Sequence, residues 1–431
     1  MADLGSIFKA YDVRGVIPDT FDADVARAIG TAFARVVGGS AVVVAHDMRP
    51  SSPELATAFA DGVTSQGLDV VFAGLGSTDL LYYGSGHLDL PGAMFTASHN
   101  PAEYNGIKMC RAGAAPISGE TGLDEIRRLA EESMTGPKAS VEGGSPSRRG
   151  APSTGDGGRR VGREHDGPAG TVTERELLPG YAAYLRDLVD LSGIRPLRVA
   201  VDAGNGMGGY TVPAVLEQGL PLEIIPLYFE LDGTFPNHPA NPLDEANLVD
   251  LRAKVREVGA DIGLAFDGDA DRCFVVDERG EPVPPSAITA LVAAQELARE
   301  PGATIIHNLI TSNAVPEIVR ERGASPSAPG SVTPSSRPPW PRPARSSAGS
   351  TPPTTTSGTS GGPTRVCSRR CTSCGSWART TVRSPGSPRS TRATRRPGRS
   401  TPRWPTHPPR WHGSARPSPA GTASPSTNST A

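Results

Sequence analysis

The stretch "SAVVVAHDMRPSSPELATAFADGVTSQGLDVVFAGLGST", residues 40–78, decides the fold class. Residues 40–50 predict a buried apolar strand that ends in a polar loop. Residues 52–67 have an amphipathic helical pattern that ends at Gly67, and the next apolar strand lies within 68–78. A strand, a helix and a second strand in this order are typical of a parallel α/β layer.

The same alternation continues along the chain on both sides of this unit. Further strands are predicted within 92–100, 105–110, 197–204, 222–230, 261–283 and 302–310, and helices within 173–191, 245–258 and 286–300. The pattern predicts consecutive α/β domains with mixed, mainly parallel sheets.

Composition divides the chain further. Residues 137–170 are rich in Gly, Ser and Arg and have almost no apolar residues, which predicts a low-complexity linker. We therefore expect one domain in 1–136, a second in 171–280 and the truncated start of a third in 281–324. The remaining residues, 325–431, differ in amino-acid composition from the rest of the chain.

Residues 325–431 contain 16 Arg and no Asp, Glu, Lys, Ile, Leu, Phe, Tyr or Met, whereas all 45 acidic residues lie in 1–324. As written, this tail has too little apolar surface to fold and is predicted to be disordered. A basic arm that binds nucleic acid is an alternative, but a shifted reading frame is favoured, and it predicts no nucleic-acid partner.

The N-terminal sequence has charges at Asp3 and Lys9 and no long apolar run, so we expect no signal peptide. No other stretch has the length needed to span a bilayer. These observations predict a cytoplasmic protein without a membrane partner.

The acidic loop "FDGDADR", residues 266–272, indicates a metal site. Asp267, Asp269 and Asp271 place three carboxylates around one point, and such hard oxygen ligands select Mg²⁺ or Ca²⁺. An EF-hand is excluded because its sixth position is Arg272 and because the chain continues as a strand. An acidic surface turn remains an alternative. A Mg²⁺ site of this kind usually completes its coordination with phosphate oxygens.

A group that could carry that phosphate is Ser98, in "TASHNP", residues 96–101. It lies in a polar turn at the end of a predicted strand, where ligands gather in α/β sheets. His99 beside it is either a loop histidine or a functional one. Lys108 is near enough to serve the same pocket as a cation or an acid, and Arg14 is a plausible donor to phosphate oxygens.

Three motifs together resemble the α-D-phosphohexomutase family, in its bacterial phosphomannomutase/phosphoglucomutase branch. They are "KAYDVRG", "TASHNPAEYNGIK" and "FDGDADRC", at 9–15, 96–108 and 266–273. "VDAGNGMGG" (201–209) and "FPNHPANP" (235–242) are similar to the second domain of that family. The resemblance covers most of 1–324 and implies that 1–136 holds a phosphoserine loop and 171–280 a metal loop.

The resemblance implies a phosphomannomutase that interconverts mannose 6-phosphate and mannose 1-phosphate through a hexose 1,6-bisphosphate. Phosphoglucomutase, acting on glucose phosphates, and a non-catalytic phosphosugar-binding remnant are the alternatives. Ser98 would carry the phosphoryl group and, with Asp267, Asp269 and Asp271, would hold Mg²⁺. Arg272 would brace the phosphoserine, His99 and Lys108 would assist proton transfer, and Tyr11 and Arg14 would bind substrate or phosphate nearby.

The same family normally has a third domain with a sugar-reading loop and a fourth with a phosphate-binding loop. Neither pattern occurs in 325–431. If the reading frame is shifted back by one base, "GSTPPTTTSGTSGG" (349–362) can be read as GEHSAHYYFRDFWG, which fits the sugar loop. We therefore expect a one-base frameshift near codons 318–326, and little or no mutase activity in the chain as written.

Overall fold

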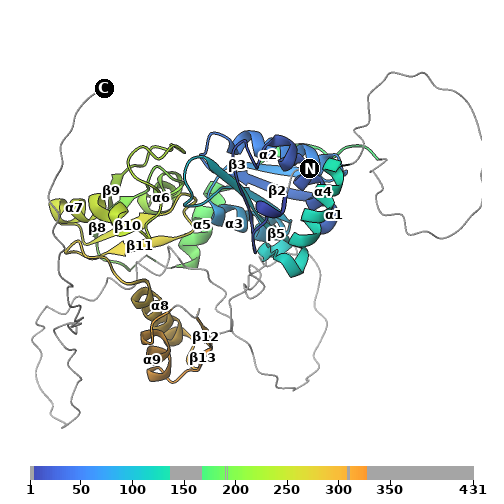
Figure 1. Ribbon diagram of the computed structural model, residues 1–431. Helices are drawn as coiled ribbons and strands as arrows, with labels where there is room; N and C mark the ends of the chain where they lie inside the picture. The colour runs from blue at the N-terminus through green and yellow to red at the C-terminus, as the bar shows by residue number, and fades with distance from the viewer. Residues whose placement is uncertain (1–3, 136–166, 190, 192, 308–310, 328–431) are drawn as a thin grey trace, which may run out of the picture. The chain divides into compact units, whose positions relative to one another are not determined.

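The computed structural model describes residues 4–135, 167–189, 191, 193–307 and 311–327 (Figure 1). The chain divides into two compact units, Met1–Arg383 and Ser384–Ala431, and all described residues belong to the first. Residues 137–166 of the expected linker and residues 328–431 of the expected tail lie outside the described residues. The expectations for these two ranges therefore stay predictions, whereas Pro326–Ser327, inside the range expected to be disordered, form a short strand.

The first sheet is seven-stranded within the described part of the chain and surrounds the unit from which the fold class was predicted. Its order is β1-β5-β4-β2-β3-β7, with β6 paired to β5. The strands β2, β3, β4 and β7 run parallel, whereas β1, β5 and β6 add antiparallel pairs. The strands are β1 Val13–Val16, β2 Ala41–His46, β3 Asp69–Leu75, β4 Gly92–Phe95, β5 Tyr104–Arg111, β6 Ala115–Pro116 and β7 Val172–Glu174.

Helices cover both faces of this sheet (Figure 1). Because side chains alternate along a strand, Val42 and Val44 of β2 join one core and Val43 and Ala45 join the other. A continuous apolar run is therefore what a strand buried on both faces requires. The first core lies under α1 Ala23–Val37, α2 Ser52–Thr64 and α4 Asp124–Thr135, and the second under α3 Thr78–Leu88 and α5 Leu178–Leu188.

The helix predicted within 173–191 is correct only in its later part. Val172–Glu174 instead forms the edge strand β7, which pairs with β3, and α5 begins at Leu178. Pro179 lies in the first turn of α5, where a missing backbone N–H has no cost. The backbone pairing with β3 outweighs the helical pattern of the preceding residues.

The second sheet is four-stranded among the described residues, in the order β11-β10-β8-β9. Its strands β8 Leu197–Asp202, β9 Leu222–Leu227 and β10 Ile262–Phe266 are parallel, and β11 Cys273–Val276 is antiparallel to β10. Residues 267–272 of the acidic loop are thus the connection between β10 and β11. Helices α6 Gly208–Val212 and α7 Val249–Val258 belong to this part, with the short helical turns η4 Pro213–Glu217 and η5 Glu245–Leu248.

A third, smaller part follows. Helices α8 Pro285–Arg299 and α9 Ala314–Glu321 pack with two short parallel strands, β12 Ile305–Ile306 and β13 Pro326–Ser327. The remaining helical turns are η1 Leu4–Ser6, η2 Ala112–Ala114 and η3 Gly119–Leu123. No helix within the described ranges is long and apolar enough to cross a membrane. The mixed, mainly parallel α/β fold predicted from the sequence is confirmed.

Candidate active site

Ser98 is buried in the loop that follows β4. Its backbone has a left-handed φ of 54°, an unusual conformation for a residue other than Gly. The Ser98 hydroxyl donates to Asp267 Oδ2 at 2.9 Å and accepts from Arg272 Nη2 at 2.5 Å. The sequence separates Ser98 from Asp267 by 169 positions, so the fold creates this contact.

The acidic loop meets the Ser98 loop closely. Ligand atoms of Asp267, Asp269 and Asp271 all lie within 4.8 Å of one another, and the first two residues are buried. A Cβ added to Gly268 would lie 2.4 Å from the Ser98 carbonyl oxygen, so only glycine allows this approach. The structure brings together the two motifs that were predicted to form one pocket.

Lys108, in β5, lies against the same carboxylates. Its Nζ donates to Asp269 Oδ2 at 2.6 Å and to Asp271 Oδ2 at 2.7 Å. Asp269 Oδ2 also accepts from the Thr78 hydroxyl at 2.5 Å. Asp269 Oδ1, in contrast, is buried and has no hydrogen-bond partner among the described residues.

The unpartnered Asp269 Oδ1 indicates that the site suits a metal ion. A buried carboxylate oxygen without a donor is costly, and a bound cation would satisfy it. The donor set consists of hard carboxylate oxygens with the Ser98 hydroxyl beside them, which suits an oxygen-seeking divalent cation. The side chains therefore fit such an ion.

The titration behaviour of the cluster reflects the crowding of like charges. Burial raises the pKa of Asp267 well above its ordinary value, and the charges of Asp269 and Asp271 add to this. Burial alone would raise the pKa of Asp269, but Lys108 and the Thr78 hydroxyl hold it below its ordinary value. Burial lowers the pKa of Lys108, but the two carboxylates outweigh this and raise it, so Lys108 is charged at neutral pH.

Arg272 and His99 lie on another side of the Ser98 hydroxyl. Arg272 Nε donates to Asp267 Oδ2 at 2.8 Å, and its Nη2 contacts His99 Nδ1. The same His99 nitrogen is 3.3 Å from Ser98 Oγ. Burial lowers the pKa of His99 to about 4, and the charges of Arg272 and Arg14 act in the same direction, so the imidazole is neutral at pH 7.

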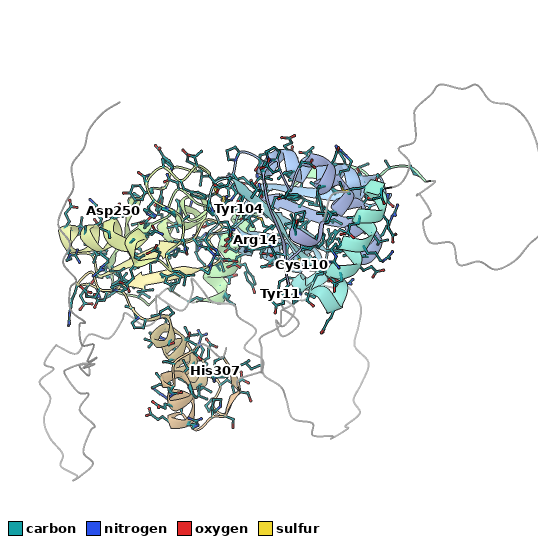
Figure 2. All side chains as sticks on the ribbon, viewed as in Figure 1. Tyr11, Arg14, Tyr104, Cys110, Asp250 and His307 are labelled. Carbon is teal, nitrogen blue, oxygen red and sulfur yellow. The ribbon has the colours of Figure 1, made fainter. Side chains whose placement is uncertain are left out.

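Arg14 reaches this loop from β1. It donates from Nη1 to Asn100 Oδ1 at 2.5 Å and from Nε to Asp12 Oδ2 at 2.9 Å. Tyr11 lies on the segment before β1 with 46% of its surface exposed (Figure 2). Of the nine predicted site residues, Tyr11 is the one that no described contact joins to the cluster.

The sequence interpretation missed two residues that belong to this site. Thr78 begins α3 and donates to Asp269. Arg49, in the loop after β2, donates to the backbone of the Ser98 loop. The "HDMRP" segment at 46–50 is a polar run after a buried strand, a signal that could have indicated Arg49.

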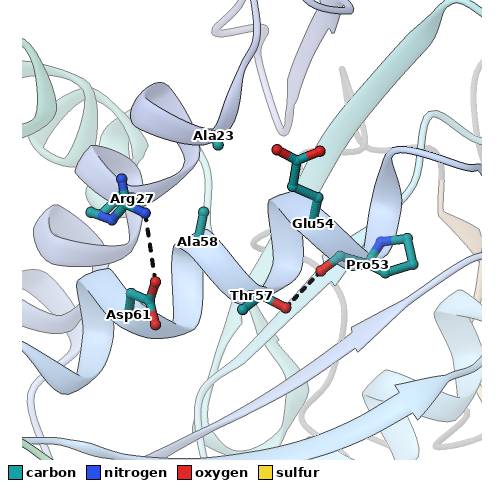
Figure 3. A pocket seen from close by; sticks show the side chains of 7 residues that line it. All are labelled: Ala23, Arg27, Pro53, Glu54, Thr57, Ala58 and Asp61. Atoms are coloured by element: carbon teal, nitrogen blue, oxygen red, sulfur yellow. Dashed lines mark hydrogen bonds and ion pairs between the residues drawn. The ribbon is translucent and has the colours of Figure 1, made fainter.

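A surface groove elsewhere on the first sheet does not compete with this site. It has a volume of about 370 Å³ and lies between α1 and α2 (Figure 3). Arg27 in its wall is paired with Asp61 at 3.5 Å, and the Thr57 hydroxyl donates to the Pro53 carbonyl of its own helix. Three of its polar side chains thus already have partners, and it contains none of the predicted site residues.

Comparison with known families accords with this geometry. The family model described as phosphoglucomutase/phosphomannomutase, alpha/beta/alpha domain I, matches residues 5–136, and that of domain II matches 179–280. Together the two ranges make up more than half of the chain. The chain belongs to the phosphoglucomutase/phosphomannomutase family. The family resemblance expected from the three motifs is confirmed.

Similar proteins of this family are known from several bacteria. A phosphomannomutase of Escherichia coli is 37% identical over 326 residues, which cover 74% of this chain and 66% of that protein. A protein named phosphohexose mutases, from Xanthomonas campestris pv. campestris, is 37% identical over 321 residues, 74% of this chain and 65% of its own. The crystal structure of a phosphoglucomutase/phosphomannomutase family protein from Burkholderia thailandensis is 34% identical, with a TM-score of 0.63, over 75% of this chain and 66% of its own. The chain thus spans just under two thirds of the length of these relatives.

Proposed function

We propose that this chain is a phosphohexomutase, with mannose 1- and 6-phosphate as its first substrates and the corresponding glucose phosphates as the alternative. The observation that supports this is the Ser98 hydroxyl, which lies between Asp267 and Arg272 beside three converging carboxylates. Mannose phosphates are proposed first because the Escherichia coli relative is named a phosphomannomutase. Glucose phosphates are the alternative because the name of the family model includes both phosphoglucomutase and phosphomannomutase.

We assign the cation to Mg²⁺, held by Asp267, Asp269 and Asp271 together with an oxygen of phosphorylated Ser98. When bound, the ion would neutralise negative charge on the phosphoryl group during transfer. Lys108, which contacts Asp269 and Asp271, and Arg272, which contacts Asp267, supply further positive charge. Positioning and charge neutralisation are the main requirements of phosphoryl transfer.

The reaction consists of two transfers in opposite directions. In the first, the Oγ–P bond of phosphorylated Ser98 breaks as a free hydroxyl oxygen of the hexose phosphate bonds to that phosphorus. The sugar hydroxyl loses its proton and the Ser98 oxygen gains one, and we assign this proton transfer to His99 and Lys108. In the second, the phosphorus of the other phosphoryl group bonds to the Ser98 oxygen as its bond to the sugar oxygen breaks. The Ser98 hydroxyl loses its proton and the sugar oxygen gains one, which leaves the isomeric monophosphate.

The test is to incubate the full chain with Mg²⁺ and glucose 1,6-bisphosphate labelled in its phosphoryl groups. We expect one labelled phosphoryl group on Ser98, located by peptide mass spectrometry, and none on that peptide in Ser98→Ala. Ser133→Ala is the control, because the Ser133 hydroxyl donates to its own helix. Subsequent turnover of mannose 1-phosphate should be slight, because residues 325–431 lack the expected sugar and phosphate loops.

One result would contradict the proposed function, and another would contradict only the expected impairment. A chain that binds the bisphosphate but leaves Ser98 unlabelled is a phosphosugar-binding remnant, the non-enzymatic alternative. Mutase turnover at an ordinary rate would instead contradict the expected impairment, while it would support the assigned reaction. The cytoplasmic location expected from the sequence stays a prediction.

A further inference from the structure

Arg49 is a buried cation to which the proposed reaction assigns no role. Arg49 lies in the loop between β2 and α2, and its side chain is fully buried. The two terminal nitrogens of its guanidinium each donate to two backbone carbonyls. Three of these carbonyls, at Ser98 (3.0 Å), Asn100 (2.7 Å) and Pro101 (2.7 Å), are in the loop that contains Ser98, and the fourth, at Tyr104 (2.9 Å), is on the first residue of β5.

The charge of Arg49 is balanced locally. Asp47 Oδ2 lies 3.3 Å from Arg49 Nε, and both side chains are inaccessible to solvent. Asp47 is itself held by the Ser52 hydroxyl at 2.6 Å and by the Arg49 backbone N–H at 3.0 Å. The two atoms of this ion pair have no hydrogen-bond partner among the described residues, so the pair is supported by the bonds to Asp47 Oδ1 and by those of the two terminal guanidinium nitrogens.

Through these bonds Arg49 acts on the conformation of Ser98. The left-handed backbone of Ser98 costs free energy and persists only if its surroundings hold it. Arg49 binds the Ser98 carbonyl, whereas Asp267 and Arg272 bind its hydroxyl. The backbone and the side chain of this residue are therefore fixed by separate charged groups.

Arg49 also contacts the part of the chain that holds the acidic loop. The ring of Phe235 lies over the guanidinium at 5.1 Å, in a cation–π contact. Phe235 belongs to the segment 235–242 that follows β9 in the second sheet. One side chain thus connects the Ser98 loop with an element outside the first sheet.

We propose that Arg49 is a positioning residue that sets the Ser98 oxygen for phosphoryl transfer without touching the substrate. The inference rests on the proposed function. A lysine would retain the charge, but its single nitrogen cannot bind four carbonyls in the planar geometry of a guanidinium. Small displacements of a reacting group can lower a rate by about 100-fold.

The experiment compares Arg49→Lys with the full wild-type chain in single-turnover labelling of Ser98 by glucose 1,6-bisphosphate. We expect the maximal rate to fall by about 10- to 100-fold, with a change of less than about threefold in the half-saturating concentration. Arg111→Lys is the matched control, because Arg111 donates to the Val36 and Thr121 carbonyls in another part of the first sheet. Its maximal rate should stay within about twofold of wild type.

Hydrogen exchange of the amides in 98–106, without any sugar, is the second measurement. Arg49→Lys should speed exchange there and leave α1 unchanged, whereas Arg111→Lys should not affect 98–106. Hydrogen exchange separates the two proposals, because it tests the role of Arg49 without any reaction. A wild-type chain whose Ser98 stays unlabelled would refute the mutase function but not the role of Arg49. If Arg49→Lys does not fold, Phe235→Leu removes only the ring above the guanidinium and should change both readouts in the same direction, by less. The role of Arg49 is overturned if folded Arg49→Lys labels Ser98 at the wild-type rate and its amides in 98–106 exchange at the wild-type rate.

Discussion

At the scale of single residues, the two oxygens of Asp269 have different surroundings. Oδ2 accepts from both Thr78 and Lys108, whereas Oδ1 is buried without a donor among the described residues. Thr78 also binds the Asp269 backbone, because its N–H donates to that carbonyl at 3.2 Å. Two bonds from the start of α3 therefore orient the carboxylate that would face the ion.

We expect Thr78→Val to weaken Mg²⁺ binding by about 10-fold, because partners that orient a metal ligand typically contribute 10- to 100-fold to affinity. Thr78→Ser keeps the hydroxyl and should bind as wild type. Isothermal titration calorimetry on the unphosphorylated chain measures both. Thr211→Val is the control, since the buried Thr211 hydroxyl donates within its own turn. Equal affinity in Thr78→Val and wild type would mean that Thr78 does not orient Asp269.

At the scale of elements, α1 and α2 pack with very little space between them. A Cβ on Gly62 of α2 would lie 2.1 Å from the Arg27 carbonyl oxygen of α1. Backbone atoms cannot move aside as the end of a flexible side chain can, so any larger residue must separate the helices. The composition of α2 alone does not reveal this.

Gly62→Ala should lower the free energy of unfolding by about 1–3 kcal/mol, measured by chemical denaturation. The same change at Gly193, where a Cβ would meet nothing within 4 Å, should be neutral or slightly stabilising. If both variants unfold at the wild-type midpoint, the close approach of α1 and α2 is not as described.

A second element-scale contact joins the end of β8 to the loop 235–242. His238 Nε2 lies 3.0 Å from Oδ2 of Asp202, the last residue of β8, and Nδ1 lies 2.9 Å from the Pro239 carbonyl. Burial lowers the pKa of His238, but the hydrogen bond and charge of Asp202, with the charge of Asp250 beyond it, raise it above its ordinary value. Protonated His238 therefore stabilises the folded chain.

A raised pKa in the folded state makes this stabilisation fully present below the unfolded pKa of His, about 6.5. It is lost as the pH rises through the folded pKa. Wild type should exceed His238→Gln in unfolding free energy by about 1–2 kcal/mol at low pH, with a smaller difference at high pH. Denaturation curves at pH 5.5 and 8.5 check this. A difference that does not change with pH would show that His238 contributes by packing alone.

At the scale of the whole molecule, the site depends on contacts between the two sheets. Ser98 and Lys108 come from the first sheet and the carboxylates from the β10–β11 connection of the second. An ion bound there would stabilise the folded chain, because the unfolded chain does not hold these groups together.

Mg²⁺ at about 100 times its dissociation constant should raise the free energy of unfolding by about 2.7 kcal/mol. Chelation should reverse the effect, and Asp269→Asn should abolish most of it. Thermal unfolding at constant ionic strength measures the shift. The same shift in Asp269→Asn would mean that the ion binds elsewhere.

The expected frameshift is also a property of the whole chain. Sequencing of the gene across codons 310–335 should reveal an extra or missing base relative to the present reading. An unchanged sequence would contradict the frameshift, and residues 325–431 would then be a genuine part of the product.

Much of this protein was predictable from local sequence. The apolar run within 40–50 predicts a strand, and the helical period of 52–67 predicts a helix. The acidic loop 266–272 predicts a set of metal ligands. Each of these features depends only on residues that are near neighbours in the sequence. The family followed from the resemblance of three short motifs, in order and spacing, to those of the phosphohexomutases. The division into domains and the roles of the site residues stay predictions.

Only the tertiary structure decided which distant groups meet. Arg49 and Thr78 had no assigned role in the sequence, because their partners are backbone carbonyls 49 or more positions away and a carboxylate 191 positions away. The edge strand β7 likewise exists because β3 offers it a partner. Local sequence determines which conformation a segment prefers, but packing determines which buried donor finds which acceptor, and in this protein those long-range pairings build the site.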